Sequence, residues 1–475
     1  MSDLILSLPE LVVLGMACAI LLACVSRRGA GLVYQLSQGT LFSALLLTIA
    51  LGPGNPGLAF HGLFVSDLLA TVLNSAILVV SMGAFVYSRD YLAARPFLSD
   101  EYFVLGLFAV LGMMVMVSAN NFLTIYLGLE LMSLSLYAMV AMHRDSAAAS
   151  EAAMKYFVLG ALSSGMMLYG ISILYGVTGS LDLHTVAGAL YQHADRSLLL
   201  VFGLVFVIAG IAFKLGVVPF HMWIPDVYEG APTPVTLFLG TAPKLSGFAI
   251  AFRLLVEGME GMVADWQQML VVLAVLSMAI GNIVAIAQWN IKRMLAYSTI
   301  AHMGFLLLGL LAGTKAGYAG SMFYVIAYAL MSMGAFGMIL LLTRARFESD
   351  RIEDFKGLAE RSPWFAFVML MLMFSLAGVP PFVGFWAKWF VIKEALAAGF
   401  VWIAVLAVAF SIIGAYYYLR IIKLMYFDTP EETAPLCCGR EMRFVMSLNG
   451  LAVLGLGVSP GVLMALCLSA VGAGR

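Results

Sequence analysis

About fourteen stretches of mostly apolar residues run along this chain, and each has roughly the 20 residues that an α-helix needs to span a lipid bilayer. Inside a bilayer the backbone must satisfy its own hydrogen bonds, so this pattern predicts an all-α polytopic membrane protein. A hydrophobic content of 63% and a charged content of 11% agree, because a soluble chain of 475 residues needs more charge on its surface. The predicted transmembrane helices occupy residues 4–25, 31–52, 65–87, 101–119, 121–142, 151–176, 198–219, 233–257, 265–288, 295–313, 316–343, 364–398, 400–426 and 446–470.

Charge and motifs exclude several other classes of protein. A net charge of −1 gives no field that would attract nucleic acid. The sequence has no phosphate-binding loop, and its five cysteines show no CxxC spacing. We therefore expect no metal site and no redox cofactor in this chain. The adjacent Cys437 and Cys438 lie in a polar connector, where ordinary free thiols are expected.

The distribution of lysine and arginine predicts how the helices are oriented. If the N-terminus lies outside, most of the 25 basic residues fall in cytoplasmic connectors, among them Lys292 and Arg293. Few fall on the outer side, Arg253 among them. This bias follows the positive-inside rule, and with an even number of helices it predicts that both termini lie outside.

Two of the predicted helices are interrupted by similar sequences. Residues 216–220 read GVVPF, and residues 378–382 read GVPPF. Proline removes a backbone donor, and a membrane helix tolerates such an interruption only where protein or water satisfies the freed groups. Paired interruptions indicate an internal repeat with an ion site at each one. Five helices separate the two motifs, and an odd offset would make the repeats inverted.

These features divide the chain into four parts. The first three helices are expected in residues 1–100, and two inverted five-helix repeats, each with one broken helix, in residues 101–257 and 258–426. A cytoplasmic connector and the last helix complete the chain in residues 427–475.

Five charged residues lie where a membrane opposes charge. They are four lysines and one acid near a helix centre: Lys155, Lys214, Lys244, Lys388 and Glu130. Each charge at the middle of a membrane helix costs at least about 2.5–3.5 kcal/mol on insertion scales. Such a cost implies water, ion pairing or neutralisation, and a function explains the cost better than packing does.

A buried lysine can exchange protons near neutral pH, because removal from water disfavours its charged form. A row of such lysines with interleaved water could carry protons across the membrane, and Glu130 could hold a neighbouring lysine in its protonated form. Either Lys155 or Lys214 could be that neighbour. Lys155 also follows Glu151 at helical i,i+4 spacing, which fits a surface ion pair equally well.

Three further features have two interpretations each. His221 and His302 lie at or in predicted helices, where a histidine either satisfies hydrogen bonds or relays protons. The polar, proline-rich stretch 226–234 follows the first interruption. It could admit protons, or it could be a rigid loop into the next helix.

Two long motifs resemble a known family. Residues 213–226 read FKLGVVPFHMWIPD, followed by APTPV at 231–235, and residues 288–304 read QWNIKRMLAYSTIAHMG. They resemble the antiporter-like proton-translocating subunits of respiratory complex I, the NADH:quinone oxidoreductase, and of multisubunit cation/proton antiporters. The phrase VYEG at 227–230 is similar to the complex I members. The resemblance covers essentially the whole chain.

The resemblance implies fourteen helices, two inverted repeats and one proton channel. It makes Glu130 and Lys214 the modulating pair, Lys244 the central carrier and Lys388 the outlet carrier, with Lys155 auxiliary. We count His221 and His302 as auxiliary from their positions in the sequence. NADH, FMN, iron–sulfur clusters and quinone would be handled by partner subunits, both peripheral and membrane-embedded, in a bacterial inner membrane. The alternatives are a cation/proton antiporter component without redox coupling and a scaffold whose buried charges only hold helices together.

Overall fold

The computed structural model describes residues 2–25, 30–52, 57–95, 99–192, 198–343, 348–430 and 439–472, and the account below concerns these residues. Within them the regular structure is helical, mostly α-helical, apart from one antiparallel hairpin of strands β1 (Gly57–Ala59) and β2 (Phe64–Ser66). The predictions for Cys437 and Cys438 concern residues outside these ranges.

Every predicted transmembrane segment contains a helix. In the described ranges, twelve helical stretches are long and apolar enough to cross a membrane, and three shorter apolar helices accompany them. The first half of the chain forms α1 (Ser2–Leu6), α2 (Leu8–Val25), α3 (Ala30–Leu51), α4 (Leu68–Ala93), α5 (Ser99–Val117), α6 (Phe122–Val140), α7 (Ala147–Thr178), α8 (Leu183–Gln192), α9 (Leu198–Leu215), α10 (Trp223–Gly230), α11 (Thr233–Leu239) and α12 (Ala242–Ala251). The second half forms η2 (Phe252–Gly258), η3 (Glu260–Met262), α13 (Val263–Ile286), α14 (Ile291–Leu311), α15 (Lys315–Leu342), η4 (Ile352–Phe355), α16 (Leu358–Arg361), α17 (Pro363–Ala377), α18 (Val383–Ala397), α19 (Val401–Phe427), α20 (Arg440–Val458) and α21 (Pro460–Gly472).

The structure differs from the predicted segments at three places. The segment predicted at 233–257 is divided into α11, α12 and the π-helix η2. The single helix predicted at 446–470 is two helices: α20 ends at Val458, and α21 begins at Pro460. The polar stretch 226–234 is mostly helical, since α10 covers its first part and α11 begins at Thr233.

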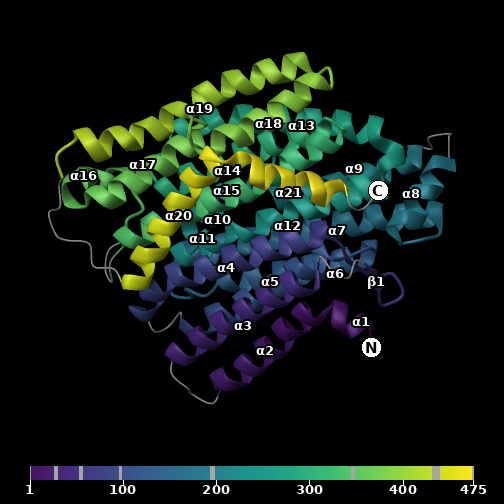
Figure 1. Ribbon diagram of the computed structural model, residues 1–475, viewed down its shortest axis with the longest axis horizontal. Coiled ribbons are helices and arrows are strands. Elements are labelled where there is room, and N and C mark those ends of the chain that lie inside the picture. Colours follow the sequence, from purple (N-terminus) through teal and green to yellow (C-terminus); the bar gives the residue numbers. More distant parts are fainter. Residues whose placement is uncertain are drawn as a thin grey trace.

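The helices pack side by side, with the most buried ones in the middle. Figure 1 places the N-terminal helices α2 to α5 on one side of the molecule and α13, α18 and α19 on the opposite side, with α11, α12, α14 and α15 between them. The central stretch Thr233–Gly258 is buried along its whole apolar window, whereas only a third of that of α19 is buried. Residues of the central helices therefore face other protein, and those of the outer helices are free to face lipid.

The two interruptions have matching backbone structures. Helix α9 ends at Leu215 and α17 ends at Ala377, and each is followed by a glycine with positive φ, +79° at Gly216 and +89° at Gly378. Such a φ suits glycine, because a Cβ would clash with the backbone. In each case the N–H of this glycine and the N–H of the residue after it both donate to a single carbonyl near the end of the helix. The acceptor is Ala212 in α9 and Phe374 in α17. Each interruption also contains a cis peptide bond before a proline.

Helices α5 and α6 touch through their backbones. A Cβ placed on Gly112 of α5 would lie 2.5 Å from the amide nitrogen of Met132. A Cβ placed on Gly128 of α6 would lie 2.8 Å from the carbonyl oxygen of Gly112. Both separations are too short for a real side chain, so the close approach of these helices requires glycine at both positions.

Candidate functional site

Lys244 lies on the first interruption. It projects from α12 with 1% of its surface exposed, and its Nζ donates to the carbonyl oxygen of Leu215 at 3.0 Å. In an unbroken helix that carbonyl would accept from the residue four positions on, which here is Pro219 and has no N–H. The proline thus leaves an acceptor free, and a buried lysine uses it. The ammonium group also lies 5.5 Å from the ring centre of Trp223, an arrangement that favours a cation.

Lys388 occupies the equivalent place at the second interruption. Its Nζ donates to the carbonyl oxygen of Ala377 at 2.9 Å, and the residue four positions after Ala377 is again a proline, Pro381. A second bond, also 2.9 Å long, reaches the hydroxyl of Ser411 on α19. The side chain is buried and lies over the ring of Phe305. The two interruptions thus hold one buried lysine each by the same device.

Lys214 and Glu130 form a looser pair. Lys214, in the last turn of α9, donates from Nζ to the hydroxyl of Ser133 on α6, one turn after Glu130. Glu130 interacts with Lys214 electrostatically without a direct ion pair, and its buried Oε1 has no hydrogen-bond partner. Lys214 also interacts electrostatically with Lys244, so a charge on Glu130 can reach the central lysine through Lys214.

Lys155 lies elsewhere. Its half-exposed side chain makes two ion pairs of 2.7 Å, one with Glu151 on its own helix and one with Asp226 on α10. The i,i+4 surface pair expected from the sequence is therefore present, and Lys214 is the lysine that interacts with Glu130. Asp226 also pairs with Arg293 at 2.8 Å. Burial alone would raise the pKa of Asp226, but hydrogen bonds from Lys155 and Arg293 outweigh it and lower that pKa.

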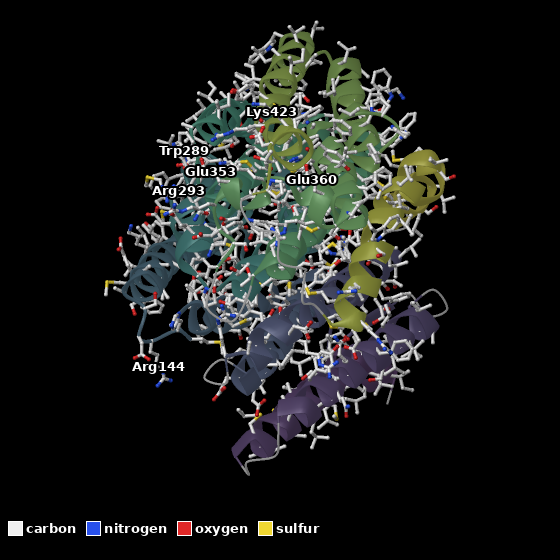
Figure 2. All side chains as sticks on the ribbon, turned by 90° about the vertical axis from the view of Figure 1, so that its left-hand side faces the viewer. Arg144, Trp289, Arg293, Glu353, Glu360 and Lys423 are labelled. Carbon is white, nitrogen blue, oxygen red and sulfur yellow. The ribbon has the colours of Figure 1, made fainter. Side chains whose placement is uncertain are left out.

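This ion cluster lies beside a polar cavity at one end of the helices. The cavity has a volume of about 470 Å³ and is lined by Glu229, Trp289, Asn290, Asp350, Arg351 and Glu353. Figure 2 shows Arg293 near Trp289 and Glu353 on the side of the molecule that faces the viewer. Arg293 also pairs with Glu229 of the cavity wall, so the cluster and the cavity are continuous.

His302 lies in a buried polar network between helices. Its Nδ1 lies 2.6 Å from the hydroxyl of Tyr324, and its Nε2 lies 3.1 Å from that of Tyr418, which also bonds to Ser298. It interacts electrostatically with Lys388. His221 differs, because it is partly exposed at the first interruption and its Nδ1 has no hydrogen-bond partner.

Three further charged residues are buried, which the sequence pattern does not predict. Lys292, expected in a cytoplasmic connector, and Arg253, expected on the outer side, have only 5% and 2% of their surfaces exposed. Lys292 donates to the carbonyl of Ala231 at 3.0 Å and interacts electrostatically with Glu229. Both lie at segment ends, where a hydropathy window indicates exposure but neighbouring helices cover them. The third charge is Glu10, which is buried near the start of α2.

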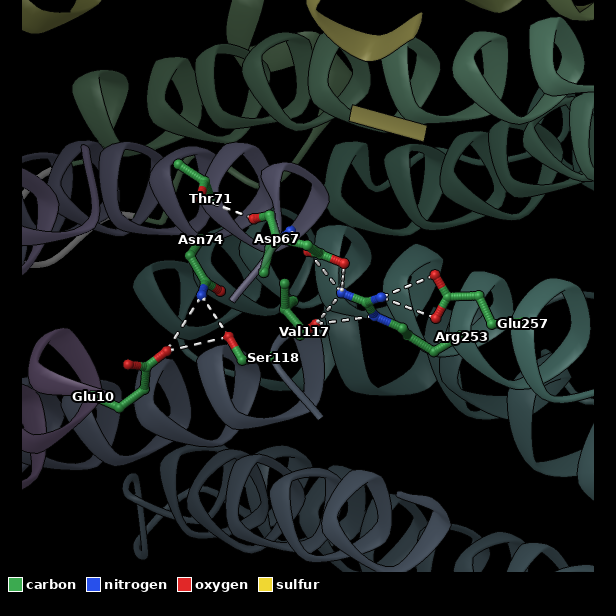
Figure 3. Close-up of polar contacts among 9 residues, drawn as sticks. Glu10, Asp67, Thr71, Asn74, Val117, Ser118, Arg253 and Glu257 are labelled. Atoms are coloured by element: carbon green, nitrogen blue, oxygen red, sulfur yellow. Dashed lines mark hydrogen bonds and ion pairs between the residues drawn. The ribbon is translucent and has the colours of Figure 1, made fainter. Parts of the chain in front are cut away.

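Arg253 joins η2 to the N-terminal helices, as Figure 3 shows. Its guanidinium donates to both carboxylate oxygens of Glu257 at 2.9 Å and pairs with Asp67, the N-cap of α4, at 2.8 Å. It also donates to the carbonyl of Val117 at the end of α5. Arg253 is therefore the buried centre of an ion triad, and the expectation that it lies free at the outer side does not anticipate these partners.

In the described part of the chain, no group of three or more His, Cys, Asp or Glu side chains could hold a metal ion.

Comparison with known proteins agrees with this architecture. Residues 119–414 match the family model described as NADH:quinone oxidoreductase/Mrp antiporter, TM. The chain is 60% identical to NADH-quinone oxidoreductase subunit N of Thiobacillus denitrificans, over 98% of this chain and 97% of that protein. It is 55% identical to subunit N of Nitrosomonas europaea over the same shares.

Solved structures extend the comparison. A chain of respiratory complex I from Thermus thermophilus superposes with a TM-score of 0.85 at 32% identity, covering 97% of this chain and all of that one. A chain of the Mrp complex from Dietzia shares the fold, with a TM-score of 0.87 at 20% identity over 98% and 97% of the two chains. The relatives at high identity are complex I subunits, which decides against an antiporter component without redox coupling. The chain belongs to the subunit N family of NADH-quinone oxidoreductase, among the antiporter-like membrane subunits of complex I.

Proposed function

We propose that this complex I subunit moves protons across the membrane through Glu130, Lys214, Lys244 and Lys388. The observation that carries the proposal is the matched pair of lysine bonds: Lys244 to the Leu215 carbonyl and Lys388 to the Ala377 carbonyl. A backbone carbonyl is a neutral acceptor, so it orients an ammonium group without fixing its charge as a carboxylate would. Each lysine can therefore give up its proton and take another.

Charge repulsion links the lysines. With Glu130 ionised, a proton on Lys214 is favoured, and when Glu130 is neutral Lys214 can pass its proton on. Protons arriving at Lys214 and Lys244 repel each other, because two like charges in a poorly polarisable interior interact strongly. This repulsion supplies a force that moves a proton from Lys244 toward the second interruption.

The network around His302 gives the proton a path between the interruptions. Tyr324, Tyr418 and Ser298 carry hydroxyls that donate and accept, and His302 joins two of them. From there Lys388, which also contacts Ser411, passes the proton outward. Lys155 and His221 take auxiliary roles, Lys155 through the ion cluster around Asp226 and His221 at the first interruption.

The proposal extends to the internal repeats, the membrane orientation and the partner subunits. Residues 101–257 and 258–426 form two inverted repeats, each with one interruption, after the helices of residues 1–100 and before the last part, residues 427–475. The basic residues favour a bacterial inner membrane orientation with both termini in the periplasm. NADH, FMN, iron–sulfur clusters and quinone are handled by partner subunits, and neighbouring antiporter-like and small membrane subunits transmit the driving force.

The test is proton pumping by assembled complex in sealed vesicles. Lys244→Met keeps the length and apolar stem of the side chain but cannot carry a proton, so NADH-driven acidification falls to the level of vesicles treated with an uncoupler. The matched control is Lys393→Met, which removes an exposed lysine from α18 and leaves pumping unchanged. Normal pumping in Lys244→Met and in Lys214→Met would show that the buried charges serve only as a scaffold.

A further inference from the structure

A small polar cavity lies among the N-terminal helices, apart from the buried lysines. It has a volume of about 20 Å³, which is room for a single particle of the size of water. Six side chains with oxygen atoms line it, from α2, α3, β2, α4 and the residue after α5: Glu10, Thr48, Ser66, Thr71, Asn74 and Ser118.

Two oxygen atoms at this cavity have no partner. Glu10 accepts two hydrogen bonds at Oε1, from Asn74 at 3.4 Å and from Ser118 at 3.3 Å, as Figure 3 shows. Its other oxygen, Oε2, is buried without a hydrogen bond, and so is Oδ1 of Asn74. These side chains are 7% and 3% exposed. Both unsatisfied atoms are acceptors, so they call for a species that is positively charged or that donates hydrogen bonds.

The carboxylate also lacks a counter-charge. Within the described ranges no basic side chain forms an ion pair with Glu10, and the other charged residues drawn in Figure 3, Asp67, Arg253 and Glu257, pair with one another. A buried carboxylate without a partner is strongly disfavoured. A water molecule would satisfy the two acceptors but leave the charge, whereas a small cation does both. A proton on Oε2 is the competing way to remove the charge, and the experiment below separates it from a bound cation.

The cavity is held in shape by the neighbouring ion triad. Ser118 follows Val117, and the backbone carbonyl of Val117 accepts a hydrogen bond from Arg253. The hydroxyl of Thr71 donates to the backbone carbonyl of Asp67, and the carboxylate of Asp67 forms an ion pair with Arg253. The walls on α4 and at the end of α5 are thus fixed by a buried arginine. The oxygen atoms are positioned in advance, which lowers the cost of binding an ion.

We propose that Glu10, Asn74 and Ser118 form a binding site for one small monovalent cation, Na⁺. Oxygen ligands suit a hard cation. A single carboxylate and a cavity of one-particle size favour a single positive charge over a divalent ion with its larger ligand set. The site is separate from the proposed proton relay, and its occupancy is a property of the N-terminal helices.

The experiment counts Na⁺ bound to purified, assembled complex by equilibrium dialysis with ²²Na⁺ in choline buffer. Native complex, Glu10→Gln and Glu101→Gln are compared, the last being a matched control at an exposed glutamate of α5. We expect Glu10→Gln to bind one Na⁺ fewer per complex and Glu101→Gln to equal the native complex. Ser118→Ala, which keeps the carboxylate, should weaken the Na⁺ affinity several-fold. NADH:quinone activity of each variant reports its assembly.

A second arm tests whether a proton on Glu10 itself removes the charge. If all complexes bind equal Na⁺, the cation site is overturned. An infrared carboxyl band that rises on acidification in native and Glu101→Gln complex, and is missing in Glu10→Gln, would then show that Glu10 is neutralised by its own protonation. Lys244→Met complex should keep the Glu10 cation, so failure of the proton relay and failure of this site are distinguishable.

Discussion

The ammonium group of Lys388 lies 2.9 Å from the carbonyl oxygen of Ala377, an acceptor that is free because Pro381 has no N–H. This contact is compatible with two roles for Lys388, a fixed positive charge or a proton carrier. Substitution of Lys388 by arginine distinguishes the two roles. Arginine keeps the charge and can donate to the same carbonyl but does not release its proton in proteins.

We therefore expect Lys388→Arg to assemble and to oxidise NADH, while its proton pumping falls to the background of uncoupled vesicles. The measurement is the ratio of protons translocated to NADH oxidised in reconstituted vesicles. A ratio close to that of the native complex would assign Lys388 a purely structural charge.

The hydroxyl of Ser133 accepts from Lys214 and positions it near Glu130. Hydrogen bonds to charged groups contribute about 1.5–3 kcal/mol, so Ser133→Ala should slow pumping by about tenfold or more. Ser135→Ala is the control, because Ser135 is on the same helix and also bonds to a backbone carbonyl but contacts no lysine. Equal pumping by the two variants would remove Ser133 from the relay.

Two substitutions of His302 distinguish a role in proton transfer from a role in packing. Glutamine can keep a hydrogen bond to Tyr324 or Tyr418, and leucine can keep neither. Neither residue titrates, so a relay role predicts that His302→Gln and His302→Leu both lose most of their pumping. A packing role predicts that glutamine preserves it. Initial rates of vesicle acidification at matched NADH oxidation rates measure the difference.

Arg253 is expected to stabilise the folded subunit through its two ion pairs. Arg253→Met leaves the partly buried Asp67 and Glu257 carboxylates without their partner, where breaking a fully buried pair costs about 3–5 kcal/mol and partial exposure lowers that cost. The thermal midpoint at which this subunit leaves the purified complex should fall clearly, and Arg253→Lys, which keeps one positive charge, should fall less. Unchanged midpoints in both variants would mean that the triad carries no net stability.

Asp226 gives a pH dependence whose sign can be stated. Its pKa is lowered in the folded protein, so its ion pairs stabilise the fold above the unfolded pKa of about 3.9 and lose this effect as the pH falls through the lower folded pKa. The difference in thermal midpoint between native complex and Asp226→Asn should be constant from about pH 6 to 8 and shrink below about pH 4. Asp145→Asn, at an exposed aspartate, should show no difference at any of these pH values.

Much of the architecture could be predicted because apolar length and charge have direct consequences in lipid. All fourteen segments contain helices, and both GV(V/P)PF motifs interrupt helices where proline removes a donor. Lys244 and Lys388 could be singled out because a charge in an apolar stretch is costly wherever the neighbouring helices lie.

What could not be predicted depends on tertiary contacts. The interruption between α11 and α12 lies inside a continuously apolar stretch, and a Gly240-Thr241 pair before Pro243 is a weak signal in a membrane helix. Lys292 and Arg253 lie near the ends of predicted segments, where the sequence pattern indicates exposure, but in the folded protein other helices cover them. The choice between Lys155 and Lys214 as the residue near Glu130 required knowing that α10 brings Asp226 to Lys155.

The contact between Gly112 and Gly128 has a consequence for the charged pair. Helix α6 carries Glu130 and Ser133, and its distance from α5 is set by two residues without side chains. Any larger residue at either position would push α6 aside and change the separation between Glu130 and Lys214. The strength of an electrostatic interaction in this protein is therefore tuned by residues that have no charge, no polarity and no side chain.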